Sequence, residues 1–337
     1  MKKLLKVILI VSFFSLIGCS EKNISEKSVI TMNGIKEITR DIIGNNAFLY
    51  YKDYDEAVSF YQKQMGFRNV FEFPGFAMIV QTSPTTFITI VNDNGRGMHT
   101  SEEPKTIAIA LLTDQLDAWY EYAVSQEMDI KNPPKPLADN PHNGFLVTDP
   151  GGYILEFEHF ALHEENVKFM PLLNVSENIY APENLETNRP GELGFKASIY
   201  WLYHKDAEEA ADFYRDVMGL EMIVRQPFSD IYTSSPSGYI GLVLDGAGIH
   251  NATHEKAVNV GFLTSNAQAW FDHLKDEPTF ELRTEELYHE MDADGNNLIN
   301  IVIGYDPDNY YIEIDEFIDV EPNKAIREAV GMVISNF

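Results

Sequence analysis

The sequence predicts an α+β fold made of two tandem copies of one domain. Residues 52–67 and 205–220 share eight identical positions at a constant offset of 153, which indicates an internal repeat. Short segments rich in Ile, Val, Thr and Phe, bounded by Gly, Pro or Asn, surround them and are typical of β-strands. A length of 337 residues also suits two domains.

The N-terminus has the parts of a bacterial export signal. Lys2 and Lys3 precede a short apolar stretch, and Gly18 stands before Cys19, the only cysteine in the chain. The apolar stretch is shorter than the roughly 20 residues that cross a bilayer comfortably. Residues 16–19 resemble a bacterial lipobox, in which the cysteine is acylated and becomes the new N-terminus.

We therefore expect residues 1–18 to be a lipoprotein signal peptide, Cys19 to carry lipid, and residues 19–41 to form a lipidated tether. This predicts a protein outside the cytoplasm, anchored to a membrane of the cell envelope. Ser20 favours the outer membrane over the inner one. The alternative is an ordinary signal peptide or a short membrane anchor that happens to contain a cysteine.

The chain is strongly acidic, with a formal net charge of −27. Such a surface repels nucleic acid, so we expect no nucleic-acid partner. The charge either serves solubility or attracts cationic ligands and metal ions. The sequence contains no Gly-rich phosphate loop and no Gly-x-Ser-x-Gly elbow, and it leaves the oligomeric state open.

Each repeat contains a helix with both ends marked. Asp53 and Glu56 have the spacing of a capping box, and the second repeat has the same pattern from Asp206. Gly66 and Gly219 lie where a left-handed residue ends a helix. We therefore expect one capped helix near the start of each repeat.

Two further stretches repeat in the same order. Residues 111–123 match 262–274, a strand end that runs into a second helix, and residues 149–160 match 306–317, an Asp-Pro turn before a final strand. Each copy is therefore predicted to contain two successive β-α-β-β-β modules. The predicted segments are a first domain at 42–162, a linker at 163–192, a second domain at 193–320, and a C-terminal helix or tail at 321–337.

This order of elements resembles the vicinal oxygen chelate superfamily, which includes glyoxalase I, extradiol dioxygenases, fosfomycin-resistance enzymes and bleomycin-binding proteins. The resemblance covers about residues 42–160 and 195–318. It implies two tandem domains of paired βαβββ modules, which curl into open cups. The sequence does not determine whether the two domains pair their sheets with each other.

Metal-using members of this family place ligands on the first strand, on the strand that opens the second module, and on the last strand. The resemblance puts these positions at Asn46, near Ile107 and at Glu156 in the first copy, and at Ile199, near Val258 and at Glu313 in the second. Only the last carboxylate is kept in each copy, whereas a catalytic divalent metal normally needs three protein ligands. We therefore expect no family-type metal centre and no other cofactor, with a divalent metal as the alternative.

The same strands predict ligand-binding faces, because side chains alternate along a strand and the resemblance turns one face into a cup. The candidates are Asn46, Phe48, Tyr50, Glu156 and Glu158 in the first copy, with His142 near the cup mouth, and Trp201, Tyr203, Glu313 and Asp315 in the second. His142 is either an exposed loop residue or a ligand contact. Aromatic, acidic cups suit an apolar or ring-shaped molecule with a cationic or hydroxyl-bearing end. The alternative is that the aromatic side chains merely fill the cups.

Three functions follow from these features, and no catalytic residue is assigned. The first is a lipid-anchored module that binds a small apolar or aromatic molecule, which the missing metal ligands favour. The second is an enzyme, a metal-dependent glyoxalase-like lyase or an extradiol-type dioxygenase, which the two retained carboxylates favour. The third is a structural or partner-binding lipoprotein whose cups are filled. Fold alone does not choose among them.

Overall fold

The computed structural model describes residues 42–134 and 140–332. The predicted signal peptide, Cys19 and the tether at 19–41 lie outside the described residues. Among the residues that are described, no helix is long and apolar enough to cross a membrane. Both repeats belong to one compact unit that begins at Ile38.

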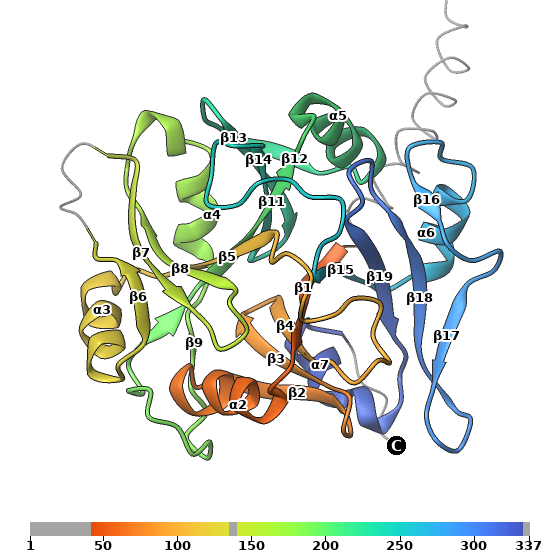
Figure 1. Cartoon of the computed structure of the whole chain (residues 1–337), viewed down its shortest axis with the longest axis horizontal. Coiled ribbons are helices and arrows are strands. Elements are labelled where there is room, and N and C mark those ends of the chain that lie inside the picture. Colours follow the sequence, from red (N-terminus) through yellow and green to blue (C-terminus); the bar gives the residue numbers. More distant parts are fainter. Residues whose placement is uncertain (1–41, 135–139, 333–337) are drawn as a thin grey trace, which may run out of the picture. The chain divides into compact units, whose positions relative to one another are not determined.

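Most strands belong to two large mixed sheets, sheet A and sheet B (Figure 1). Sheet A contains, in spatial order, β16 (Glu281–Leu282), β18 (Asn297–Tyr305), β19 (Tyr311–Phe317), β15 (Val258–Thr264), β1 (Ile42–Tyr51), β4 (Thr86–Asn92), β3 (Ala77–Ser83) and β2 (Arg68–Phe73), with β17 (Tyr288–Met291) paired to β18. Sheet B contains β12 (Glu221–Arg225), β13 (Ser229–Ser235), β14 (Gly238–Leu244), β11 (Ala197–His204), β5 (Ile107–Leu112), β8 (Ile154–Phe160), β7 (His142–Thr148) and β6 (Asp129–Asn132). A small ribbon joins β9 (Ile179–Tyr180) to β10 (Gly194–Phe195).

Each large sheet takes one module from each repeat. Sheet A joins the first module of the first repeat to the second module of the second repeat through the antiparallel pair β1 and β15, with Asn46 opposite Gly261. Sheet B joins the other two modules through the antiparallel pair β5 and β11, with Ala110 opposite Ile199. The fold is thus α+β with two curled sheets, as predicted, and the two repeats exchange modules.

The strands at these junctions explain why the modules pair. All residues of β5, β11 and β15 are buried, so none of these strands could serve as an exposed sheet edge. Alternate residues then serve opposite faces: in β1, Ala47, Leu49 and Tyr51 join a core shared by both sheets, whereas Asn46 and Tyr50 face the other way. That second face of each sheet is its cup.

The helices follow the same repeat. In the first repeat they are α2 (Tyr54–Ser59) with its π-helical continuation (Phe60–Gln64), α3 (Leu116–Ser125) and α4 (Phe169–Val175), and in the second α5 (Ala207–Asp212) with its π-helical continuation (Phe213–Val217), α6 (Ala267–Leu274) and α7 (Lys324–Ala329). Short 3₁₀ turns at Glu164–Asn166 and Glu321–Asn323 precede α4 and α7.

The predicted capping is present. The Asp53 carboxylate accepts a hydrogen bond from the Glu56 backbone N–H at 3.1 Å, and Asp206 caps α5 in the same way. Gly66 and Gly219 adopt φ angles of +64° and +70°, which favour glycine. The last turn of each helix widens to π geometry, a feature that the sequence pattern did not indicate.

The segment predicted as a linker begins with a further repeated element. Asn166 and Asn323 are fully buried, and each donates from its side-chain amide to backbone carbonyls at the end of the preceding strand. The following helix packs its apolar side chains onto one sheet, α4 through Phe169 and Leu173 on sheet B and α7 through Ile326 on sheet A. The predicted C-terminal helix is present as α7, which ends earlier than the apolar pattern suggested.

Candidate functional site

The exchange of modules changes which candidate residues meet. The sequence grouped Asn46, Phe48 and Tyr50 with Glu156 and Glu158, but these two sets lie on different sheets. The sheet A cup combines Asn46, Phe48 and Tyr50 with Glu313 and Asp315, whereas the sheet B cup combines Trp201 and Tyr203 with His142, Glu156 and Glu158. The grouping by repeat was wrong because modules of different repeats share a sheet. The last strand of the first repeat, β8, pairs with β5, and β5 pairs with β11 of the second repeat.

The sheet B cup contains a cavity of about 430 Å³. Carboxylate, aromatic and aliphatic side chains from five strands, two loops and the 3₁₀ turn at Glu164–Asn166 surround it. They are His142, Glu156, Glu158, Glu165, Trp201, Tyr203, Gln226, Pro227, Phe228, Ser229, Val243, Ala247, Gly248 and Ile249. The five candidates that the structure brings to this cup therefore line the same cavity: His142, Glu156, Glu158, Trp201 and Tyr203.

The acidic and basic groups of the sheet B cup interact with one another. His142, which begins β7, pairs through Nδ1 with Oε1 of Glu158 at 2.6 Å, and this hydrogen bond raises the pKa of His142. Burial and the neighbouring carboxylate of Glu158 raise the pKa of Glu156 to about 8. Glu158 is 5% exposed, and its Oε2 has no hydrogen-bond partner among the described residues.

Aromatic walls give the sheet B cup its shape. Trp201 lies against Gly241 of β14 so closely that a Cβ on this glycine would be 2.0 Å from the indole Cε3. Tyr203 makes an edge-to-face contact with His250, with ring centroids 5.2 Å apart. Phe228 is 62% exposed and Ile249 is 44% exposed, so an apolar rim borders the cavity.

Most of the equivalent groups of the sheet A cup bond to one another, although Asp315 Oδ1 is buried without a hydrogen-bond partner among the described residues. Tyr50 donates its hydroxyl to Asn259 Oδ1 at 2.8 Å, and Asn259 Nδ2 donates to Glu313 Oε1 at 2.5 Å. Asn46 exchanges hydrogen bonds with the hydroxyl of Thr89. Burial raises the pKa of Glu313 to about 7, although the hydrogen bond from Asn259 opposes the rise.

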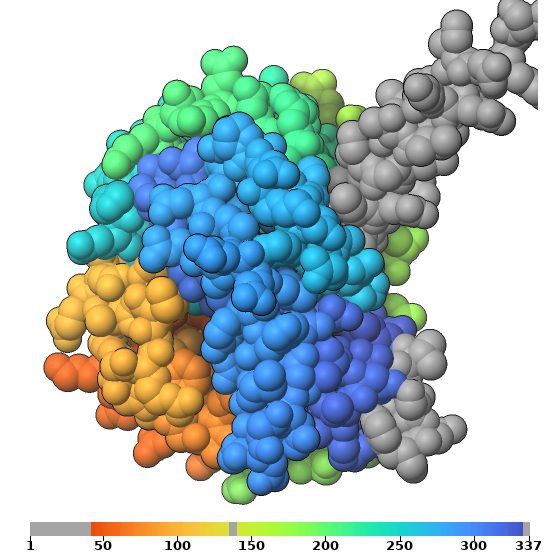
Figure 2. Space-filling view, turned by 90° about the vertical axis from the view of Figure 1, so that its right-hand side faces the viewer, coloured from red at the N-terminus to blue at the C-terminus, as the bar shows by residue number. Residues whose placement is uncertain are grey.

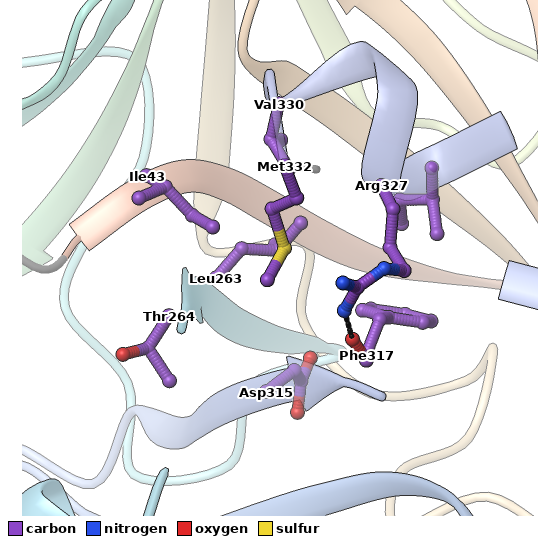
Figure 3. A pocket seen from close by; sticks show the side chains of 9 residues that line it. Ile43, Leu263, Thr264, Asp315, Phe317, Arg327, Val330 and Met332 are labelled. Carbon is purple, nitrogen blue, oxygen red and sulfur yellow. Dashed lines mark hydrogen bonds between the residues drawn. The ribbon is translucent and has the colours of Figure 1, made fainter. Parts of the chain in front are cut away.

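The C-terminal segment fills another part of sheet A. Val330 and Met332 project towards Leu263, Asp315 and Phe317 (Figure 3), and the hollow between them has a free volume of about 0 Å³. Burial raises the pKa of Asp315 well above its usual range. Asp315, a ligand-binding candidate from the sequence, therefore faces packed side chains.

The family's metal positions can now be compared with the residues present. The three strands meet at Asn46, Gly261 and Glu313 in sheet A, and at Ile199, Ala110 and Glu156 in sheet B. Each set offers one carboxylate, and sheet A adds one amide that is already bonded to Thr89. Nowhere in residues 42–134 and 140–332 do three His, Cys, Asp or Glu side chains gather as a metal cluster. These donor sets do not fit a family-type metal centre.

Sequence reasoning missed two histidines beside the cups. His99 lies between Tyr50 and Tyr311, with ring centroids 5.6 and 5.9 Å away, and His250 contacts Tyr203 in the second repeat. A repeated Gly-x-Gly-x-His pattern at 95–99 and 246–250 could have identified both. Asn259 was missed because no local pattern marks a polar residue on a buried strand.

A model of the Glyoxalase/Bleomycin resistance protein/Dioxygenase superfamily matches residues 43–157 and 197–314, more than half of the chain. A search of curated proteins gave no match. Among solved structures, the chain is similar to a glyoxalase I mutant from Zea mays, with a TM-score of 0.57 and 12% identity over 87% of this chain and 99% of that one. It is also similar to a putative dioxygenase from Bacillus subtilis, with a TM-score of 0.58 and 15% identity over 88% of this chain and 91% of that one. The last two likenesses concern the fold alone. With two matched domains and two curled sheets, the chain belongs to the Glyoxalase/Bleomycin resistance protein/Dioxygenase superfamily.

Proposed function

We propose that this protein is a lipid-anchored component of the cell envelope, outside the cytoplasm, that binds a small apolar or aromatic molecule without a family-type metal centre. The cavity of about 430 Å³ in the sheet B cup carries the proposal. Ligand pockets are typically about 300–1,000 Å³ in volume, with apolar walls and a few oriented polar groups. The expected partners are thus a small molecule in this cup and a membrane at Cys19.

Two features support binding over metal-dependent chemistry in this cup. The family positions there are Ile199, Ala110 and Glu156, so two of the three side chains have no donor atom. Two further polar groups of the cup, His142 and Glu158, bond to each other. A lyase or dioxygenase that relies on a family-type metal would lack ligands at these positions.

The C-terminal segment covers sheet A beside Asp315, which bears on the purely structural alternative. Val330 and Met332 pack onto sheet A, whereas the sheet B cavity keeps its volume although α4 covers a neighbouring part of the sheet. Because unfilled concave space is a feature of binding sites, we assign the ligand to sheet B and a structural role to sheet A.

A thermal-shift screen of the full chain with small aromatic compounds tests the binding proposal. A ligand that binds only the folded state raises the melting temperature, and the rise grows with the logarithm of the ligand concentration once this exceeds Kd. Ile249→Trp puts bulk at the cavity rim and should abolish the shift. Met98→Trp is the matched control, since Met98 is the equivalent exposed residue of the first repeat and does not line this cavity. Equal shifts in both variants would contradict the assignment to sheet B.

Metal analysis of the purified full chain tests the absence of a family-type centre. We expect less than stoichiometric Fe, Mn, Ni or Zn after purification without chelators. Stoichiometric metal that is lost in Glu156→Gln or Glu313→Gln would favour the enzymatic alternative instead.

The anchor is tested separately. We expect Cys19→Ser to abolish fatty-acid labelling and to release the protein from membranes after alkaline washing. Continued membrane retention of this variant would refute lipid attachment at Cys19 and leave the ligand proposal untouched.

A further inference from the structure

We propose that the ligand of the sheet B cup is a cation, an aromatic or apolar compound that carries a protonated amine or a quaternary ammonium group. The inference rests on the proposed function and names the ligand class of the same site.

The charges around the cavity favour a cation. Glu158 and Glu165 contribute carboxylates, Glu156 adds a carboxyl group whose raised pKa leaves it largely protonated near neutral pH, and His142 is the one basic side chain among the lining residues. A ligand with a positive group would balance this excess, while the formal net charge of −27 attracts cations from a distance. An anionic ligand would add repulsion inside a partly desolvated space.

Glu158 supplies the most specific contact. Its side chain is buried and lines the cavity, one oxygen accepts from His142, and the buried Oε2 has no hydrogen-bond partner among the described residues. A buried carboxylate oxygen without a partner is costly, and a charged donor is the partner that satisfies it best. Glu156 lies two residues away on the same strand face and adds a second acceptor.

The aromatic wall provides a complementary surface. The Trp201 indole packs against Gly241 and lines the cavity. A positive group over the face of a tryptophan is attracted by the ring quadrupole. The exposed side chains of Phe228 and Ile249 at the rim can cover the apolar part of the same ligand.

The sheet A cup differs at the aromatic wall and at the first carboxylate, although Asp315, the equivalent of Glu158, also has a buried oxygen without a partner among the described residues. Phe48 occupies the position of Trp201, and Thr89 stands where Gly241 lies beneath the indole. Glu313, the equivalent of Glu156, already accepts a hydrogen bond from Asn259. The positively charged ligand is therefore assigned to sheet B alone, and Glu313 provides a matched control.

Calorimetric titration of the full chain with tryptamine, tryptophol and indole-3-acetate tests the ligand class, because these probes share a ring and differ in charge. We expect tryptamine to bind at least about tenfold more tightly than tryptophol and indole-3-acetate to bind most weakly, since a charged hydrogen bond outweighs a neutral one by at least that factor. Glu158→Gln should remove most of the preference, Glu156→Gln should reduce it less because this group is largely protonated near neutral pH, and Glu313→Gln should retain it.

The outcomes separate the two proposals. If tryptophol binds as tightly as tryptamine in the wild type, the cation inference is overturned and the proposed binding function stands. If tryptamine binds preferentially but Glu313→Gln removes the preference, the assignment to sheet B is overturned. If none of the three probes binds and the aromatic thermal-shift screen is also silent, the proposed function itself fails. The comparison of probes on the wild type needs no variant to fold.

Discussion

Glu156→Gln should change how the stability of the protein depends on pH. Burial and the charge of Glu158 raise the pKa of Glu156 from 4.5 to about 8 in the folded protein. Between these values the folded chain holds one more proton than the unfolded chain, so this group makes stability fall as pH rises. The contribution is fully present below pH 4.5 and is lost as pH passes through 8.

The structure sets the size of this effect. Each pKa unit is worth about 1.4 kcal/mol, so a rise from 4.5 to about 8 corresponds to roughly 5 kcal/mol of unfolding free energy. Glutamine is nearly the same shape and does not titrate. Relative to Glu156→Gln, the wild type should therefore lose several kcal/mol of stability between pH 5 and pH 9.

Urea denaturation of both proteins at a series of pH values measures this difference. Subtracting the two profiles gives the contribution of Glu156 together with its interaction with Glu158 and His142. Glu313→Gln is the matched control in sheet A. The stability difference between the wild type and Glu313→Gln should level off about one pH unit lower than the difference for Glu156→Gln, because burial raises the pKa of Glu313 only to about 7. Parallel pH profiles for wild type and Glu156→Gln would refute the reasoning.

Three further variants test packing and capping. Gly241→Ala places a methyl group against Trp201, so we expect it to lower the free energy of unfolding by about 1–3 kcal/mol and to shift the tryptophan fluorescence spectrum. An unchanged spectrum would count against the close contact. Asn323→Ala removes two hydrogen bonds to buried carbonyls and should cost about 1–3 kcal/mol in thermal unfolding, whereas a neutral effect would mean that α7 docks without them. Asp53→Ala should cost about 1 kcal/mol through loss of the helix cap, while Asp55→Ala, in the same turn but not the cap, should cost less.

Short-range features of this protein were predictable from the sequence. The capping carboxylates at Asp53 and Asp206 and the left-handed glycines at Gly66 and Gly219 act within a few residues, so their chemistry is visible in the local pattern. The repeat then made the two domains recognisable, because each local pattern occurs twice in the same order. The alternation along β1 likewise predicted that Asn46 and its neighbours share a face.

Tertiary structure decided which faces meet. The opening strand of a module can pair with the opening strand of either module of the other repeat. The apolar sequences of β5 and β15, which are buried throughout, do not distinguish these two partners. Pairing of β1 with β15 placed Asn46 beside Glu313 instead of Glu156. Likewise, only the packed fold shows Met332 over Asp315 while the space beside Glu158 stays open, because filling a cup depends on segments distant in the chain. Several candidate residues were thus proposed from the sequence, and which of them lie in the same cup was set by long-range strand pairing.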